Sequence, residues 1–417
     1  MAITNIAISN FKSFKELDLD LRRFNVVIGA NASGKSNLVE VFRFLKSIED
    51  NDLDDAVSLH GGQKAILNRR IGVSGPLKMR VISDQPTKWA GWEGIVQIHE
   101  MRYEFALRAK HPQNGLDVED EHFTLKLRTE AGGKDIELGI SVLASPGERR
   151  VCINPPDLTE RLRDMGIDLS QTPLAGADAH RQQLSSVMRA TAANALLPRY
   201  AFHGFMGPFG SLFRRVGAYD IDPRAVKKPH EMAGRASLEE SGENLALVLR
   251  NILADPEKRR KFHNLVRYML PFVTEVGIEK YLGESVLLKL REAYYEGALL
   301  ANLLSDGTVN VVALIVALFF EHKDVVIIEE PERNIHPHLI SGLMELMKDA
   351  ARNKQVIITT HSPEVVRHAG VENLLLMSRD KEGFSTVSRP AEKEQVKVFL
   401  ENDLGLDEVF VQELWGM

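Results

Sequence analysis

The sequence predicts an α/β protein with a mixed, largely parallel sheet, an antiparallel β subdomain and a mainly helical or irregular insertion. Strands and helices alternate in the C-terminal part, which is typical of parallel βαβ packing. Several β-rich stretches recur between residues 77 and 128, at spacings that suit an antiparallel meander. From about residue 109 to 235 proline and glycine are scattered, and strand signals fade after about Asn154.

Bulk composition is that of an ordinary globular protein. The chain has 417 residues, of which 44% are hydrophobic and 26% charged, enough for two or three domains or one domain with a large insertion. A net charge of −6 argues against general coating of nucleic acid but leaves room for a local basic face. The single cysteine, Cys152, excludes an internal disulfide framework and is most simply a small buried side chain.

No targeting or membrane segment is visible. Residues 1–5 lack the basic region and the long apolar run of a signal peptide. The longest apolar run, about residues 309–320, is interrupted by Asn310 and is too short to span a bilayer. We therefore expect a cytoplasmic protein with no membrane partner.

Alternating residues predict two half-buried strands at 3–8 and 15–21, with a turn at 10–14 between them. A third strand at 24–28 leads through a glycine-bounded loop into a helix that ends near residue 48. The acidic run 49–55 predicts a break at the surface.

Regular patterns resume at residue 238. Predicted helices cover about 245–253, 257–269, 309–320 and 337–351, and predicted strands cover about 275–281, 285–292, 325–328, 355–360 and 374–377. Within the insertion we expect a helix at about 180–195 and a loop-rich, basic stretch at 199–235. The predicted domain division is 1–108, 109–235, 236–389 and a C-terminal helical tail at 390–417.

The loop after the third strand is Gly29-Ala30-Asn31-Ala32-Ser33-Gly34-Lys35-Ser36, and strand, loop and helix together form the context of a phosphate-binding P-loop. Gly29 and Gly34 let successive N–H groups point at phosphate oxygens, and the following helix adds its dipole. Lys35 supplies charge to the β- and γ-phosphates, and the Ser36 hydroxyl is a ligand for Mg²⁺. We expect Asn31, Ser33 and Asn37 to contact the nucleotide as well. The alternative, a glycine-rich turn that caps an ordinary helix, fits the flanking elements less well.

A second motif is the apolar run 325–328 followed by Glu329 and Glu330. We expect this strand beside the P-loop strand, where its C-terminal end brings carboxylates to the nucleotide. Glu329 would hold Mg²⁺, directly or through water, and Glu330 would polarise the attacking water as general base. An apolar strand that ends in two acids is often merely structural, but the upstream P-loop favours the catalytic interpretation.

Two further segments suit the same site. His361 ends the strand 355–360, one strand–helix unit after the acidic pair, where it would contact the γ-phosphate or the attacking water. Ser305 and Gly307 open the helix 309–320 and would present free N–H groups to an anion. The alternatives are a surface histidine and a plain helix cap.

Together these segments resemble the ABC-type ATPases, in the branch with the SMC/RecF-like and OLD-type ATPases. The matches, in the family's order, are the P-loop 29–36, Ser241-Gly242-Glu243-Asn244-Leu245, the signature Leu304-Ser305-Asp306-Gly307-Thr308, the acidic strand with Pro331-Glu332, the turn Asn334-Ile335-His336-Pro337 and His361, preceded by Ile8-Ser9-Asn10-Phe11-Lys12-Ser13-Phe14. The resemblance covers about residues 1–108 and 236–380 and implies an ABC ATPase head as the fold.

This resemblance implies that ATP and Mg²⁺ bind between two heads, in a head-to-head homodimer or a higher oligomer. The P-loop, Glu329, Glu330 and His361 of one chain would face Ser305 and Gly307 of the other. A two-fold dimer would then contain two equivalent sites. By similarity, Lys12 reaches the nucleotide phosphates, and Asn334 and His336 lie where the two heads communicate.

Some positions depart from the family pattern. Glu329 stands where most ABC proteins have Asp, and Gln63 is the candidate for the glutamine that ligates the metal ion. The insertion lacks the long coiled coil of SMC proteins. The tail after about Asp380 is too short for the Toprim nuclease domain of OLD nucleases.

These features predict an ATP-hydrolysing, ATP-gated dimer that acts in DNA-related processes or in bacterial anti-phage defence. The basic stretches 199–235 and 258–261 are candidate contacts for DNA phosphates, although solvated surface charge is the plainer interpretation. The alternative is a nucleotide-gated sensor or scaffold that controls a separate effector protein, such as a nuclease or toxin from a neighbouring gene. A kinase or GTPase is disfavoured, because no guanine-selecting Asn-Lys-x-Asp motif is present.

Overall fold

The computed structural model describes residues 2–84, 87–88, 96–110, 115–129, 135–145, 148–154, 213–232, 234, 237–281 and 283–392. The chain divides into two compact units, which are described separately here. Unit 1 holds residues 1–22, 40–216 and 379–386, and unit 2 holds residues 23–39, 217–378 and 387–417. The helix predicted at 180–195 and the tail beyond residue 392 lie outside the described residues.

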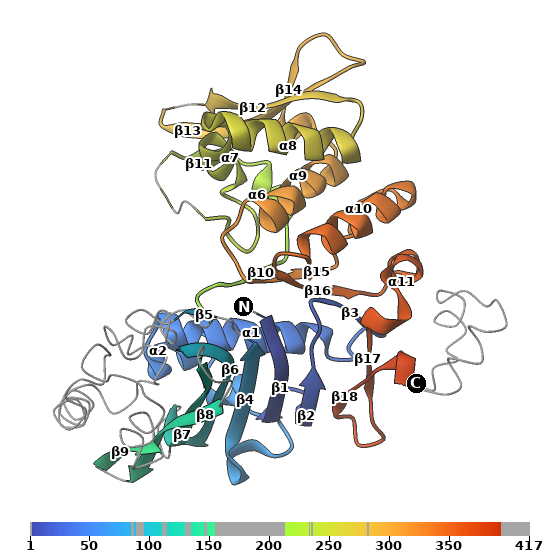
Figure 1. Cartoon of the computed structure of the whole chain (residues 1–417). Coiled ribbons are helices and arrows are strands. Elements are labelled where there is room, and N and C mark those ends of the chain that lie inside the picture. Colours follow the sequence, from blue (N-terminus) through green and yellow to red (C-terminus); the bar gives the residue numbers. More distant parts are fainter. Residues whose placement is uncertain are drawn as a thin grey trace. The chain divides into compact units, whose positions relative to one another are not determined.

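Unit 1 is built on an eight-stranded sheet in the order β2-β1-β4-β6-β7-β8-β9, with β5 paired to β6 (Figure 1). Its strands are β1 (Ala2–Phe11), β2 (Phe14–Asp20), β4 (Leu77–Asp84), β5 (Thr87–Lys88), β6 (Val96–Ala109), β7 (Leu116–Thr129), β8 (Asp135–Ser145) and β9 (Glu148–Asn154). All pairs along this order are antiparallel. Buried and less buried residues alternate along β4, as expected where one face of a sheet is covered.

The strands after residue 109 differ from the predicted division. β7, β8 and β9 continue the sheet that contains β6, so the antiparallel meander expected at 77–128 extends to Asn154, past the domain boundary placed at residue 108. Tyr103 of β6 lies opposite Phe123 of β7, and both rings are buried. Cross-strand aromatic pairs of this kind stabilise a ladder and pin its register.

The acidic run 49–55 was predicted to be a surface break, and for Glu49 this is wrong. Helix α1 (Lys35–Asp50) includes Glu49 in its last turn, and the Glu49 side chain is 0% exposed. Its carboxylate accepts hydrogen bonds from the main-chain N–H groups of Phe213 (2.6 Å) and Arg214 (2.9 Å). These two donors satisfy one oxygen of the buried carboxyl group, Oε2, while Oε1 has no hydrogen-bond partner among the described residues. Two short helices follow in unit 1, α2 (Leu53–Leu59) and α3 (Gln63–Ile66).

Unit 2 is built on a six-stranded sheet in the order β10-β15-β16-β3-β17-β18 (Figure 1). The strands are β10 (Val216–Tyr219), β15 (Val325–Glu329), β16 (Gln355–Thr360), β3 (Phe24–Ile28), β17 (Leu374–Arg379) and β18 (Ser385–Ser388). The pairs β15–β16, β16–β3 and β3–β17 are parallel. Almost every residue of β3, β15 and β16 is buried, which explains their continuous apolar sequences.

Helices and a second sheet complete unit 2. The helices are α6 (Pro223–Val226), α7 (Leu245–Ala254), α8 (Pro256–Met269), α9 (Asp306–Phe319), α10 (Pro337–Ala350) and α11 (Pro363–Ala369). A four-stranded antiparallel sheet runs β11-β13-β12, with β14 paired to β13; its strands are β11 (His230–Glu231), β12 (Val273–Tyr281), β13 (Ser285–Glu292) and β14 (Ala298–Leu300). This mixed α/β architecture confirms the predicted fold class.

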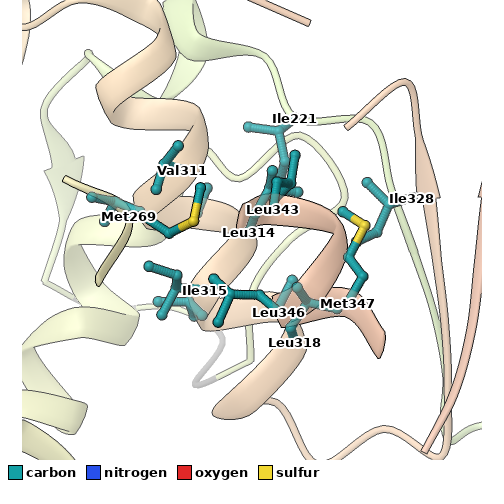
Figure 2. Close-up of a cluster of buried hydrophobic side chains, with 14 of the residues drawn as sticks. Ile221, Met269, Val311, Leu314, Ile315, Leu318, Ile328, Leu343, Leu346 and Met347 are labelled. Atoms are coloured by element: carbon teal, nitrogen blue, oxygen red, sulfur yellow. The ribbon is translucent and has the colours of Figure 1, made fainter. Parts of the chain in front are cut away.

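The core of unit 2 forms around α9. This helix is apolar on every side and almost wholly buried, as a central helix must be. Leu314 and Leu318 of α9 interleave with Leu343 and Met347 of α10 (Figure 2). Each such buried side chain contributes about 1.5–3 kcal/mol of transfer free energy. The two helices therefore pack tightly against each other and support the residues at their N-termini.

Candidate nucleotide site

The loop at 29–34 adopts a conformation that only glycine permits at two positions. A Cβ at Gly29 would lie 2.2 Å from the main-chain oxygen of Met377 and 2.8 Å from Oγ of Ser33. Gly34 has a φ of 115°, which side chains disfavour. Both glycines of the motif are therefore required by the backbone itself. No acidic side chain occupies the first turn of α1, so its helix dipole is not neutralised there.

Lys35 is tied to the same loop. Its Nζ donates to the main-chain oxygens of Gly29 (2.8 Å) and Ala30 (3.1 Å). Burial lowers the pKa of Lys35, and the nearby carboxylates of Glu330 and Glu332 only partly offset that effect. The ammonium group thus lies inside the curl of the loop, where a phosphate would be held.

Strand order brings the predicted motifs to one edge of the sheet. Glu329 lies opposite Thr359, and Thr360 lies opposite Ile28. The carboxyl ends of β15, β16 and β3 therefore meet at the same edge. We expected β15 directly beside the P-loop strand, and that is wrong, because β16 lies between β15 and β3. The strand that carries His361 is the central one of the three.

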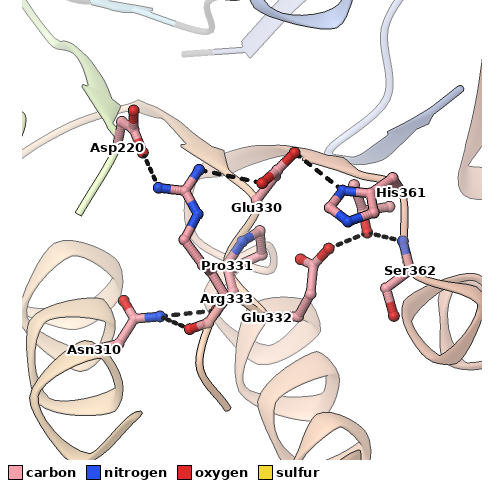
Figure 3. A network of polar contacts seen from close by, with 9 residues as sticks. Asp220, Asn310, Glu330, Pro331, Glu332, Arg333, His361 and Ser362 are labelled. Atoms are coloured by element: carbon pink, nitrogen blue, oxygen red, sulfur yellow. Dashed lines mark hydrogen bonds and ion pairs between the residues drawn. The ribbon is translucent and has the colours of Figure 1, made fainter. Parts of the chain in front are cut away.

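Glu330 is the centre of a polar network (Figure 3). Its Oε1 lies 3.0 Å from Nδ1 of His361, and its Oε2 accepts from Nη2 of Arg333 at 3.2 Å. The other guanidinium nitrogen of Arg333 donates to Asp220 at 2.9 Å. Glu330 has a φ of 44°, a rare conformation for a residue with a side chain, and its N–H donates to Thr359 O at 2.9 Å.

The protonation of Glu330 suits a base. Burial works to raise the pKa of its carboxyl, but the hydrogen bond from Arg333 and the charges of His361 and Arg333 outweigh burial, so the pKa lies below its ordinary value. Glu330 is therefore a carboxylate at neutral pH. A carboxylate beside a histidine is able to accept a proton from a water molecule.

A second carboxyl, that of Glu332, lies behind the first. Its Oε1 accepts from Oγ1 of Thr360 at 2.5 Å, and the same hydroxyl oxygen accepts from the N–H of Ser362 at 2.9 Å. Its Oε2 is buried and has no hydrogen-bond partner within the described residues. Burial raises the pKa of Glu332, and the hydrogen bond from Thr360 opposes the change.

The signature segment caps α9. Ser305 is exposed, and its Oγ accepts from the N–H of Thr308 at 3.1 Å. The carboxylate of Asp306 is ion-paired with Lys227. A Cβ at Gly307 would lie 2.3 Å from the main-chain oxygen of Asn334, so the backbone needs glycine here too. The helix cap is the alternative that the sequence left open for Ser305, and the contact of Gly307 with the turn at Asn334 was not predicted.

Lys12 and Gln63 belong to unit 1. Nζ of Lys12 lies 3.1 Å from Oε2 of Glu40, a carboxylate that His60 also contacts at 3.3 Å. The hydrogen bond from His60 is the largest cause of a Glu40 pKa of about 2, and Lys12 adds to it. Gln63 is buried, and its Oε1 has no partner among the residues that the structure describes. Their roles at a nucleotide remain predictions.

Several residues of the network carried no clear signal in the sequence. Arg333 and Asp220 are 113 positions apart, so nothing local links them. Asn310 was noted only as an interruption of an apolar run. Its side-chain amide donates to the main-chain oxygens of Pro331 (3.2 Å) and Arg333 (2.8 Å). A polar residue inside an apolar helix was the available clue.

The donors present fit a magnesium nucleotide. In the described part of the chain no cluster of three or more His, Cys, Asp and Glu side chains could hold a metal ion by itself. Mg²⁺ does not require such a cluster, because it is commonly held by one or two carboxylates together with phosphate oxygens and water. Ser36 and Glu329 lie at the P-loop and at the end of β15, and they are the side chains in unit 2 that would supply the protein ligands.

Comparisons with known proteins agree with this geometry. A family described as "AAA ATPase domain" matches residues 1–139, and one described as "AAA domain, putative AbiEii toxin, Type IV TA system" matches residues 210–367. The chromosome partition protein Smc of Methanocaldococcus jannaschii is 35% identical over 72 residues. The chain is an ATPase with AAA-type domains, and it is similar to the SMC/RecF-like ABC-type ATPases. The P-loop lies in the first matched segment of this ATPase, and Glu330 and His361 lie in the second.

Similarity to individual relatives is local. The Smc match spans 16% of this ATPase and 6% of the relative, and an uncharacterised protein of the same organism is 23% identical over 91 residues, which are 21% of this ATPase and 24% of that protein. A solved SMC head bound to the C-winged helix domain of ScpA gives a TM-score of 0.47 at 12% identity, over 93% of this ATPase and 97% of that chain. The SMC head domain of Thermotoga maritima gives 0.43 at 12% identity, over 93% and 99%.

Proposed function

We propose that this ATPase binds ATP with Mg²⁺ and hydrolyses it in the cytoplasm, with Glu330 as the general base. The observation that carries the proposal is the pairing of Glu330 with His361 at the edge of the sheet where the P-loop begins. A base, a switch histidine and a phosphate loop on three neighbouring parallel strands suit γ-phosphate hydrolysis and little else.

Each residue has a distinct role in this proposal. Lys35 and the loop N–H groups hold the phosphates, while Ser36 and Glu329 hold Mg²⁺, which would neutralise charge on the transferred phosphoryl group. The carboxylate of Glu330 orients a water molecule and takes its proton. His361 fixes the orientation of that carboxylate through the 3.0 Å contact of Nδ1. Gln63 and Lys12 would add a metal ligand and a phosphate contact.

We further propose that the working form is a homodimer in which Ser305 and Gly307 of one copy complete the site of the other. Two features support this. Ser305 is exposed at the N-terminus of a 14-residue helix, where N–H groups and the helix dipole attract an anion. Ser305 and Gly307 also stand at the start of α9, whose body is almost wholly buried, which suits a surface that must close on a partner.

Two experiments test these proposals. Glu330→Gln should leave ATP binding intact, abolish turnover and trap a dimer with ATP, as measured by nucleotide binding, phosphate release and light scattering. Hydrolysis by this variant at the wild-type rate would show that Glu330 is not the base. Ser305→Arg and Lys35→Ala should each be inactive, whereas their mixture should regain part of the activity, because one composite site then contains neither change. A mixture as inactive as its components would contradict the composite site.

A role on DNA is supported by helix α8. Lys258, Arg259, Arg260 and Lys261 are exposed on it, and none forms an ion pair with the part of the chain that the structure describes. Lys261 lies over the rings of Phe319 and Phe320, at 5.4 and 5.8 Å. Unpaired cations on one helix suit a phosphate backbone. Lys258→Glu with Arg259→Glu should abolish ATP-dependent DNA binding, and Arg352→Glu, in the turn after α10, is the matched control. Binding that is unchanged or independent of salt would exclude this face.

The alternative function is a nucleotide-gated scaffold for a separate effector. The family description that names a putative toxin of a toxin–antitoxin system supports it, as it supports a role in anti-phage defence. Co-purification with the product of a neighbouring gene, lost in Glu330→Gln or Lys35→Ala, would favour this function. An ATPase that acts on DNA without a partner protein would favour the first function, a role on DNA.

A further inference from the structure

The carboxyl of Glu332 is a second acid at the site for which the proposed hydrolysis has no use. It follows the base Glu330 by two residues, with the rigid Pro331 between them. One of its oxygens is bonded to Thr360 at 2.5 Å, and the other is shielded from solvent. A shielded carboxyl cannot meet the attacking water, so Glu332 is not a spare base.

Its partner, Thr360, lies directly before His361 and is wholly buried. The hydroxyl has one proton, which goes to Glu332, and its oxygen accepts the N–H of Ser362 at 2.9 Å. The residues on both sides of His361 are thereby held by one hydroxyl group (Figure 3). Ser362 is also the N-cap residue of α11, so this bond lies directly before that helix.

Two carboxylates of the same turn thus hold the same loop in different ways. Glu330 contacts the imidazole ring of His361, and Glu332 holds the backbone around that ring through Thr360. If Glu332 did not hold the backbone through Thr360, the 3.0 Å contact with the partly exposed Glu330 carboxylate would be left to position the ring. The His361 side chain is itself 54% exposed. An exposed side chain that is held by one contact samples other rotamers.

We propose that Glu332 is a positioning residue for His361, acting through the hydroxyl of Thr360. The proposal rests on the hydrolytic function proposed above. What Glu332 must supply is an acceptor oxygen for Thr360, and not a charge. A glutamine at 332 keeps such an oxygen, and a serine at 360 keeps the hydroxyl. Alanine at 332 and valine at 360 remove one end of the bond each.

The first readout is kinetic. Glu332→Gln and Thr360→Ser should retain kcat for ATP hydrolysis within about threefold. Glu332→Ala and Thr360→Val should lose about 10- to 100-fold in kcat with KM unchanged, the size expected from a displaced catalytic group. The double variant should be no worse than either single one. Glu332→Gln as inactive as Glu332→Ala would show that ionisation matters, and it would overturn the proposal.

The second readout does not depend on hydrolysis. The imidazole ¹⁵N signals of His361, assigned with His361→Gln, report on its ring environment in the free protein. They should move in Glu332→Ala and Thr360→Val and remain in place in Glu332→Gln and Thr360→Ser. Unmoved signals in Glu332→Ala, with thermal melting showing a folded protein, would overturn the proposal. If Thr360→Val does not fold, the Glu332→Ala and Glu332→Gln pair decides alone. If the wild-type chain has no ATPase activity, the proposed function is wrong, but the NMR test of Glu332 can still be interpreted.

Discussion

A Cβ at Gly307 would lie 2.3 Å from the main-chain oxygen of Asn334, so the signature segment and the turn after the acidic strand are in direct backbone contact. Asn334 adopts a φ of 64° in that turn. Asn310, one helical turn beyond Gly307, binds two carbonyls of the same turn. The N-terminus of α9 and the turn that carries Glu330 therefore behave as one block within the chain.

Gly307→Ala tests that block. The added methyl group has no space and must push the turn away, which we expect to cost about 1–3 kcal/mol of unfolding free energy and to lower turnover. Thermal melting and phosphate release measure the two effects. Gly342→Ala in α10 is the control, since its Cβ would meet side-chain atoms and no backbone, with the sulfur of Met269 at 3.3 Å and the ring of Tyr268 at 3.7 Å. Equal effects of the two changes would contradict the contact as a constraint.

Asn310→Leu removes the two hydrogen bonds from α9 to the turn. Two carbonyl groups would lose their donor inside the core, and we expect a loss of about 2–4 kcal/mol, measured by urea unfolding. Asn251→Leu, on the exposed side of α7, is the matched change without buried partners. If the two variants are equally stable, the amide of Asn310 does not hold the turn.

Arg333→Gln tests the electrostatics of the base. Burial raises the pKa of Glu330 and Arg333 works against it, so removal of the guanidinium should raise that pKa. A base must be ionised to act, and the acid limb of the kcat/KM profile should therefore move to higher pH. Arg352→Gln removes an exposed arginine whose ion pair with Asp349 is long, at 3.8 Å. This change should leave the pH profile of kcat/KM unmoved. An unmoved acid limb in Arg333→Gln would contradict the role of the ion pair.

Glu49 makes stability depend on pH. Burial raises its pKa from 4.5 to about 7, against the hydrogen bonds from Phe213 and Arg214. Between about pH 4.5 and pH 7 the native chain therefore keeps a proton on Glu49 that the unfolded chain has lost. Stability should fall as pH rises from about 4.5 to 7, by at most about 3 kcal/mol, at 1.36 kcal/mol per pKa unit.

Glu49→Gln should flatten that slope, because glutamine cannot ionise and still accepts a hydrogen bond. Urea unfolding at pH 5 and pH 8 measures the difference. Glu284→Gln, at an exposed position, should leave the slope unchanged. If stability still falls with rising pH in Glu49→Gln, other titratable groups cause the slope.

The sequence was most informative where local pattern and chemistry coincide. The loop with Lys35, the acidic end of β15 and the strand before His361 were predicted because each combines an apolar run with a polar end. The order of strands was not, because it depends on pairing across hundreds of residues, and β16 takes the place expected for β15. Glu49 was misplaced at the surface, since two backbone N–H groups far along the chain compensate its burial.

The pairing of β3 has a consequence for synthesis. Phe24 lies opposite Val356, about 330 residues later, and the other neighbour of β3 is β17, which is made later still. When the ribosome has made residues 29–36, neither neighbour of the preceding strand yet exists. The nascent chain therefore cannot form its phosphate loop until nearly all of unit 2 has emerged, so incomplete chains should neither capture nor consume nucleotide.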